Sequence, residues 1–138
     1  MRIGMNHTLP HASPEEWAST LRALGCGAAV FPVSGEASEE VIDAYCKAAE
    51  KYDIVIGEIG IWANPISPDP AVREKAIARS LSQLRLAERV GARCCVNYAG
   101  AKGLSNHDPY PENYLPETRQ EIIEHIRFLL DTAKLERT

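Results

Sequence analysis

The sequence lacks a long apolar run, an excess of positive charge and a signal-peptide pattern. Nowhere do about 18 apolar residues follow one another, as a membrane-spanning helix requires. Residues 1–7 (MRIGMNH) contain no apolar stretch with a small-residue cleavage site. The formal net charge is −4 and no Lys/Arg cluster occurs, which disfavours nucleic acid and membranes as partners. We therefore expect a cytoplasmic protein.

Several short motifs are missing as well. No GxGxxG or GxxxxGK[ST] pattern occurs, so no nucleotide-binding loop is predicted. CxxC spacing is also absent, and the cysteines fall inside expected strands or a helix. We predict buried, reduced thiols at Cys26, Cys46, Cys94 and Cys95.

What the chain does contain is an alternation of apolar runs and helical patterns. Its 138 residues, of which 45% are hydrophobic and 25% charged, suit one soluble domain with a real core. The apolar runs predict strands at 1–6, 28–31, 54–61 and 92–99. Capping residues predict helices that begin near Ser13, Ser38, Asp69 and Pro116. The continuous apolar run at 54–61 predicts a strand that is covered on both faces.

Four βα units in strict alternation imply a parallel sheet with right-handed crossovers. The pattern itself leaves two arrangements open. The strands can curl as half of a TIM-type barrel, or they can lie flat as an open, doubly wound sheet.

In either arrangement ligands bind where the strands end, and four residues there are candidates for substrate binding. Glu58 interrupts an apolar strand, so it serves a site or is held by a structural partner such as a backbone amide or an Arg. His7 suits acid/base chemistry or a hydrogen bond to a hydroxyl, but it also suits a structural hydrogen bond. Trp62 offers an apolar face to a sugar ring or caps the rim, and Asn97 offers a donor and an acceptor to a polyol.

Other polar residues carry weaker expectations. The remaining histidines, His11, His107 and His125, are predicted to be solvated. Residues 99–103 (AGAKG) are glycine-rich and could approach a phosphate through backbone amides, although their spacing is not that of a P-loop.

Three segments together resemble the sugar phosphate isomerases/epimerases of the xylose-isomerase-like TIM-barrel superfamily. They are 57–65 (GEIGIWANP), 87–93 (AERVGAR) and 96–100 (VNYAG). The resemblance covers the whole chain, residues 1–138, but only about half of a barrel, which usually needs about 250 residues. It implies an α/β fold of four βα units: the N-terminal half of a (β/α)8 barrel with parallel strands.

The resemblance also implies a function in carbohydrate metabolism. Relatives of this kind use a divalent metal, Mn, Mg or Zn, to hold a sugar or sugar phosphate while a proton moves between adjacent carbons. The metal ligands and catalytic carboxylates are expected beyond Thr138, so neither is assigned here, and His7, Glu58, Trp62 and Asn97 would line the substrate side. The 138-residue chain alone is then expected to be inactive. The alternatives are a self-associating half-barrel, which would be a homo-oligomer, and a sugar-binding module without catalysis.

Overall fold

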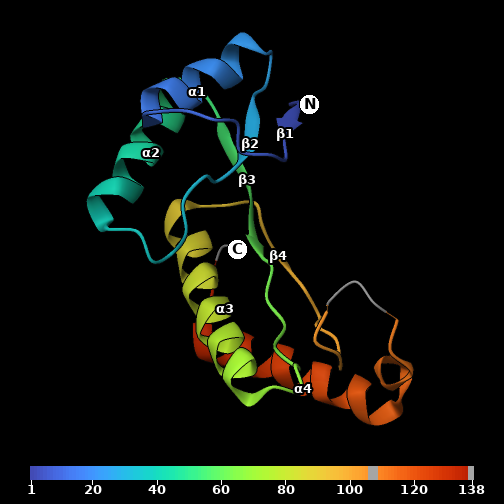
Figure 1. Ribbon diagram of the computed structural model, residues 1–138. Coiled ribbons are helices and arrows are strands. Elements are labelled where there is room, and N and C mark those ends of the chain that lie inside the picture. The colour runs from blue at the N-terminus through green and yellow to red at the C-terminus, as the bar shows by residue number, and fades with distance from the viewer. Residues whose placement is uncertain (106–108, 137–138) are drawn as a thin grey trace.

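A single four-stranded parallel sheet organises the protein, in the computed structural model that describes residues 1–105 and 109–136 (Figure 1). Its strands are β1 (Gly4–Met5), β2 (Ala28–Val30), β3 (Val55–Ile61) and β4 (Cys94–Asn97). They lie in the order β1-β2-β3-β4, so each strand pairs with the next one along the chain. A doubly wound sheet reverses its strand order at a switch point, whereas a barrel does not. The order therefore resolves the sequence-level ambiguity in favour of an α/β half-barrel.

The helices begin where the capping residues predict. They are α1 (Pro14–Ala23), α2 (Glu39–Lys51), α3 (Pro70–Val90) and α4 (Pro116–Ala133), with a short 3-10 helix, η1 (Pro111–Tyr114), before α4. The side chains of Ser13, Ser38 and Asp69 each accept a hydrogen bond from a backbone amide of the first turn. Gly91 ends α3 with a φ of 65°, a left-handed conformation that favours glycine. The strands at the two edges are shorter than predicted.

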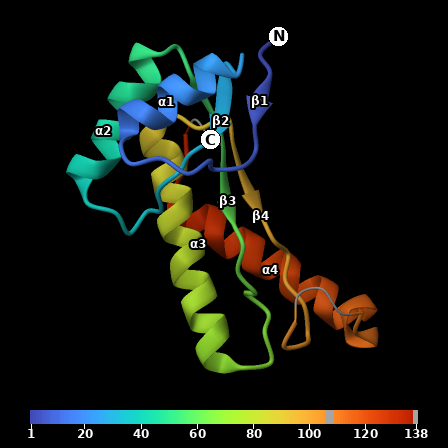
Figure 2. The ribbon, with the colours of Figure 1, turned by 45° about the horizontal axis from the view of Figure 1, so that its top comes forward.

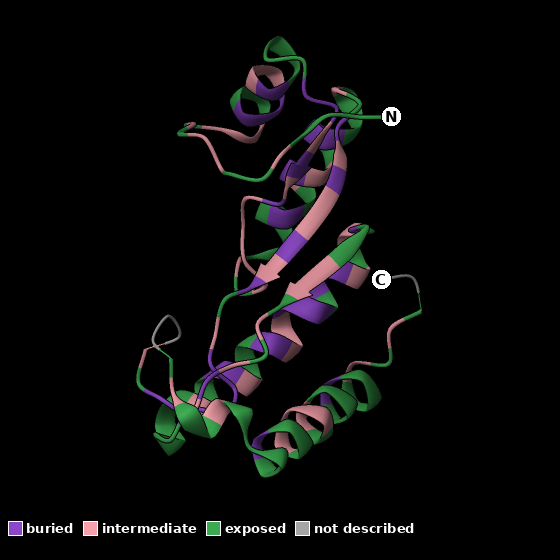
Figure 3. Cartoon of the chain, turned by 90° about the vertical axis from the view of Figure 1, so that its right-hand side faces the viewer, coloured by how far each residue is buried: buried purple, intermediate pink, exposed green. Residues whose placement is uncertain are grey.

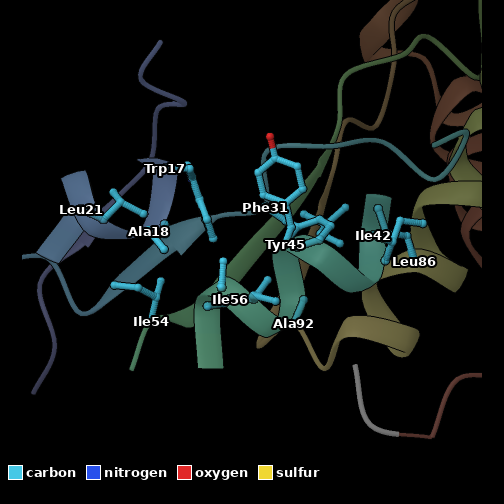
Figure 4. Close-up of a cluster of buried hydrophobic side chains, with 14 of the residues drawn as sticks. Trp17, Ala18, Leu21, Phe31, Ile42, Tyr45, Ile54, Ile56, Leu86 and Ala92 are labelled. Carbon is cyan, nitrogen blue, oxygen red and sulfur yellow. The ribbon is translucent and has the colours of Figure 1, made fainter. Parts of the chain in front are cut away.

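The main core lies between the sheet and the first three helices, which cover one face of it (Figures 1 and 2). Its centre is aromatic: the ring of Tyr45 stands edge-on to the rings of Trp17, at 5.6 Å, and Phe31, at 6.2 Å (Figure 4). Edge-to-face pairs of this kind add stabilisation to the burial of their area. The core thus joins α1, α2 and the β2 end into one unit.

The longest strand, β3, carries a shift in register that decides which side chains face the core. Ala29 pairs with Ile56 but Val30 pairs with Glu58, so β3 has one extra residue there. The four strand-region isoleucines remain buried on the helix side despite the shift: Ile54, Ile56, Ile59 and Ile61. Gly57 and Glu58 absorb the shift.

The prediction that residues 54–61 are covered on both faces is wrong. The residues between the isoleucines, including Glu58 and Gly60, are only half-buried (Figure 3). They lie on the inner face of the half-barrel, opposite the face that the first three helices cover. A continuous apolar run does not distinguish a strand buried on two faces from one buried on a single face.

None of the helices within residues 1–105 and 109–136 combines the length and apolarity needed to cross a membrane.

Candidate functional site

A concavity of about 270 Å³ occupies the inner face of the sheet, and Glu58 lies in it. Small residues create the space: Gly4, Ala28 and Gly57 are part of its lining. Glu58 is the one carboxylate among the described residues that line it. Asn6 at the end of β1 and Cys94 on β4 also contribute. A half-open cup with a single carboxylate and an amide is suited to binding hydroxyl groups.

The carboxylate of Glu58 makes no hydrogen bond or ion pair with the residues that the structure describes. The structural alternative, a carboxylate held by an Arg or a backbone amide, therefore has no support in this part of the chain. The charge of Glu58 still acts on its surroundings. Burial, followed by Cys94 and Glu58, raises the pKa of the Cys95 thiol to about 11. An unpaired carboxylate on a concave face is free to accept hydrogen bonds from a ligand.

Trp62 lies on the same face of β3, over Gly60. A Cβ atom added to Gly60 would be 2.4 Å from Nε1 of Trp62 and 2.8 Å from its Cε2, so only glycine leaves room for the indole. The Trp62 side chain is 63% exposed. Glu58 and Gly60 of β3 and Trp62 directly after it are spaced two residues apart, a spacing that predicts a shared face. This face therefore presents a carboxylate acceptor and, farther along, an exposed apolar indole.

The other two predicted residues are placed differently. His7 is exposed in the loop after β1, and its neighbour Asn6, not His7, lines the concavity. Asn97 pairs with Ile61, whose side chain is fully buried on the helix side of the sheet. Because paired residues of parallel strands share a face, the register assigns Asn97 to the helix side, where it is exposed at the end of β4. Glu58 and Trp62 thus share the inner face of the sheet, whereas His7 lies in the loop after β1 and Asn97 on the helix side.

Asn64 holds together the loops that follow β3 and β4. Its side chain is buried; Nδ2 donates to the carbonyl of Ala101 at 2.8 Å and that of Gly103 at 3.3 Å. Its Oδ1 accepts from the amides of Ala101, at 2.9 Å, and Ile66, at 3.3 Å. Gly100 has a φ of 97°, and an added Cβ would be 2.7 Å from Asn64 Oδ1. The rim of the site is therefore a fixed structure.

Gln83 of α3 plays a similar part at the end of β2, and sequence analysis did not identify it. The buried Gln83 accepts from the amide of Gly35 at 2.7 Å and donates to the carbonyl of Gly60 at 3.2 Å. It thus supports the strand position on which Trp62 rests. A glutamine within an amphipathic helix gives no local signal of such a role.

The predicted phosphate approach at residues 99–103 is not supported. The amide of Ala101 donates to Asn64, and the amide of Lys102 donates to Asn113 Oδ1 at 2.7 Å. The Lys102 ammonium group is paired with Glu121. Two of the amides of this segment and its one positive charge are therefore engaged within the protein.

Two histidines predicted to be solvated are partly buried, so that prediction is wrong for them. His11 Nε2 lies 2.7 Å from the Tyr45 hydroxyl, and its Nδ1 lies 2.7 Å from the carbonyl of Leu9. His125 is half-buried on α4, and burial lowers its pKa, an effect that Glu121 partly opposes. His107 lies outside the described residues.

The cysteine prediction holds in part. All four thiols are free, but only Cys26 is buried, and Cys94 is exposed on the inner face. Cys94 and Cys95 are adjacent on a strand and therefore point to opposite faces. Alternation along β4 explains why one thiol is accessible and its neighbour packs against the core.

No group of three His, Cys, Asp or Glu side chains within the described ranges is arranged to hold a metal ion. Glu58 has no second acidic or imidazole ligand beside it among the residues that line the concavity. These residues do not fit a metal site.

The fold and the site define a parallel α/β half-barrel with a polar concavity on its inner face. Comparison with known families gives the more specific result: residues 18–137 match the model of the xylose isomerase-like TIM barrel family, and the chain belongs to that family. A search of curated proteins gives no significant match.

Solved structures share this fold. A proposed xylose isomerase from Rhodospirillum rubrum superposes with a TM-score of 0.66 at 15% identity, covering 94% of this chain and 47% of its own. A D-psicose 3-epimerase from Clostridium cellulolyticum, solved with D-tagatose, gives 0.69 at 16% identity, covering 97% and 49%. A D-psicose 3-epimerase solved with D-fructose gives 0.70 at 18% identity, with the same coverage. The chain therefore spans about half the length of these proteins.

Proposed function

We propose that this chain forms the β1–β4 half of a sugar or sugar phosphate isomerase/epimerase, an enzyme that moves a proton between adjacent carbons of its substrate. The observation that carries the proposal is the free carboxylate of Glu58 in the concavity on the inner face of a half-barrel of this family, with the exposed indole of Trp62 farther along the same face. If a divalent metal takes part, its ligands come from outside the described residues. A cytoplasmic location, as expected from the sequence, is part of it.

The role of this half is to bind and orient the sugar. Glu58 would accept hydrogen bonds from one or two hydroxyl groups, and Trp62 would lie against the apolar C–H side of the sugar. Asn6, which lines the same concavity, would supply both a donor and an acceptor. With no catalytic pair assigned, the 138-residue chain is expected to bind a ketose weakly and to leave its stereochemistry unchanged.

Calorimetric titration with D-fructose and D-tagatose tests the proposal, because the similar epimerase structures were solved with these two sugars. Loss of a hydrogen bond to a charged group costs roughly 1.5–3 kcal/mol, so Glu58→Gln should weaken binding by about 10-fold or more. Glu50→Gln, an exposed carboxylate on α2, is the matched control and should bind like the wild type. Equal affinities for these two variants would exclude Glu58 from the site.

A second candidate is self-association, favoured by the open edges of the sheet. Within the described residues, β1 and β4 each pair with one neighbour only. A two-fold axis along the barrel would let β4 of one copy pair with β1 of another in parallel. Sedimentation equilibrium decides the matter: a mass about twice 15.2 kDa supports the pairing, and a stable species of 15.2 kDa rules it out.

A further inference from the structure

A second concavity, of about 340 Å³, lies at the carboxyl end of β3, between the first turns of α3 and the loops after β3 and β4. Trp62 and Asn64 come from one loop, and Leu104 comes from the other. From α3 it receives Lys75 and Arg79. The described residues that line it include no carboxylate.

Lys75 and Arg79 are one helical turn apart, which places them side by side on α3. Neither makes a hydrogen bond or an ion pair with the described residues. Four other cations do have carboxylate partners: Arg2 pairs with Asp53, Lys51 with Glu15, Arg89 with Asp43 and Lys102 with Glu121. Lys75 and Arg79 differ from most other cations in lining a concavity together.

Like charges at this spacing repel each other on a helix, and a bound anion between them would offset that repulsion. The Asp69 side chain already caps the helix, so the helix terminus is not the binding group. A guanidinium and an ammonium group together match a dianion, because Arg binds phosphate oxygens through two parallel hydrogen bonds and Lys adds a point charge.

Trp62 connects this concavity with the candidate site. Trp62 is among the residues that line the cationic concavity, and its indole lies against Gly60, on the face of β3 that carries Glu58. A ligand whose carbohydrate part contacts the indole can therefore have a charged end at Lys75 and Arg79. An unphosphorylated sugar offers these two cations only neutral hydroxyl acceptors, without a negative charge.

We propose that Lys75 and Arg79 form the phosphate subsite of a phosphorylated sugar that Trp62 and Glu58 hold at its other end. This assignment rests on the proposed function, which it narrows from sugars in general to sugar phosphates. The two cations act on the phosphate group and take no part in proton transfer.

The test uses isothermal titration calorimetry at low and high salt. It measures the affinity of the 138-residue chain for D-fructose 6-phosphate, D-fructose and inorganic phosphate. Fructose 6-phosphate should bind at least about 10-fold more tightly than fructose at low salt, because charge-assisted hydrogen bonds are roughly twice as strong as neutral ones. High salt should reduce the difference. The double variant Lys75→Gln/Arg79→Gln should bind fructose 6-phosphate no more tightly than fructose.

The matched control is Lys47→Gln/Arg93→Gln, which removes the same charge from exposed residues that do not line this concavity. It should keep the preference for the phosphorylated sugar. Equal binding of fructose and fructose 6-phosphate, or equal losses in the two double variants, would overturn the subsite. So would equal binding of inorganic phosphate and fructose 6-phosphate, because the sugar part would then make no contact.

Failure of the subsite and failure of the proposed function give different results. If only the subsite is wrong, fructose still binds in a manner that depends on Glu58, with no gain from the phosphate. If the proposed function is wrong, Glu58→Gln leaves the binding of both sugars unchanged, whatever Lys75→Gln/Arg79→Gln does to phosphate.

Discussion

The first and the last helices of the protein use their apolar residues very differently. Helix α1 has 10 residues and buries three of them, Trp17, Ala18 and Leu21. Helix α4 has 18 residues and buries only Thr118 and Leu129, and it is drawn mostly in the exposed colour in Figure 3. Both helices are amphipathic in sequence. Periodicity states which face of a helix is apolar, but burial also requires a surface for that face to lie on.

The reason is the number of neighbours that each helix has. Helix α1 packs against α2 and shares the main core with the sheet, whereas α4 crosses α3 (Figures 1 and 2) and joins it in a small cluster. That cluster has three buried members: Ile61, Leu84 and Leu129. The stability of the chain should therefore be concentrated in the half that contains α1.

The most sensitive test of this difference between α1 and α4 is to truncate one aromatic side chain in each helix. Trp17 is 3% exposed and Phe128 on α4 is 49% exposed. We expect Trp17→Ala to lower the free energy of unfolding by about 3–5 kcal/mol, which leaves a small domain largely unfolded. Phe128→Ala should cost less than about 1 kcal/mol. Urea unfolding followed by circular dichroism measures both, and similar losses would show that α4 is as well packed as α1.

The parts of the structure that the sequence predicts are those that depend on local interactions. Helix starts are local, because a Ser13 or Asp69 cap acts on amides two or three residues away. The apolar run at 54–61, in contrast, indicated neither the register shift in β3 nor the half-exposed inner face of this strand. Asn64 and Gln83 act on residues 23 to 48 positions away, and no local pattern encodes such partners.

Glu58 and Trp62 could be predicted to share a face, because they are four residues apart in an extended segment and side chains at i and i+4 point the same way. His7 and Asn97 could not be placed in the same way. Their position depends on where short edge strands end and on the register with a neighbouring strand, and both are tertiary properties.

A second prediction concerns the buried amide of Asn64, which joins the loops after β3 and β4. Replacement by Ala would leave the amide and carbonyl of Ala101 without their partner, at a cost of about 1–3 kcal/mol. Asn97→Ala, at an exposed strand end, should change stability by less than about 0.5 kcal/mol. Hydrogen exchange should locate the effect of Asn64→Ala in residues 62–69 and 99–105, while α1 stays protected. An effect spread evenly over the chain would contradict a local role in the rim.

The smallest expected effect is a dependence on pH that originates in α4. His125 is half-buried and its Nε2 atom has no hydrogen-bond partner among the described residues. Burial lowers its pKa from the usual 6.5, although Glu121, which is paired with Lys102, opposes the shift. The neutral imidazole is therefore the form that the folded protein prefers.

The sign of the effect follows from this preference. As pH falls through 6.5, the unfolded chain takes up the proton before the folded one, so stability is fully present above pH 6.5 and declines toward the lowered pKa of the folded state. The carboxyl groups of Glu15 and Asp53, whose pKa values are lowered by Lys51 and Arg2, titrate at more acidic pH and leave this window unaffected.

Urea unfolding measured between pH 7.5 and 5.5 tests this dependence. The free energy of unfolding should change with pH by an amount that corresponds to the uptake of less than one proton, and His125→Phe should remove this slope. His7→Gln, at an exposed position, should retain the slope. Hydrogen exchange at pH 5.5 should accelerate in α4 before it does so in α1; simultaneous acceleration in both helices would mean that the two regions unfold as one.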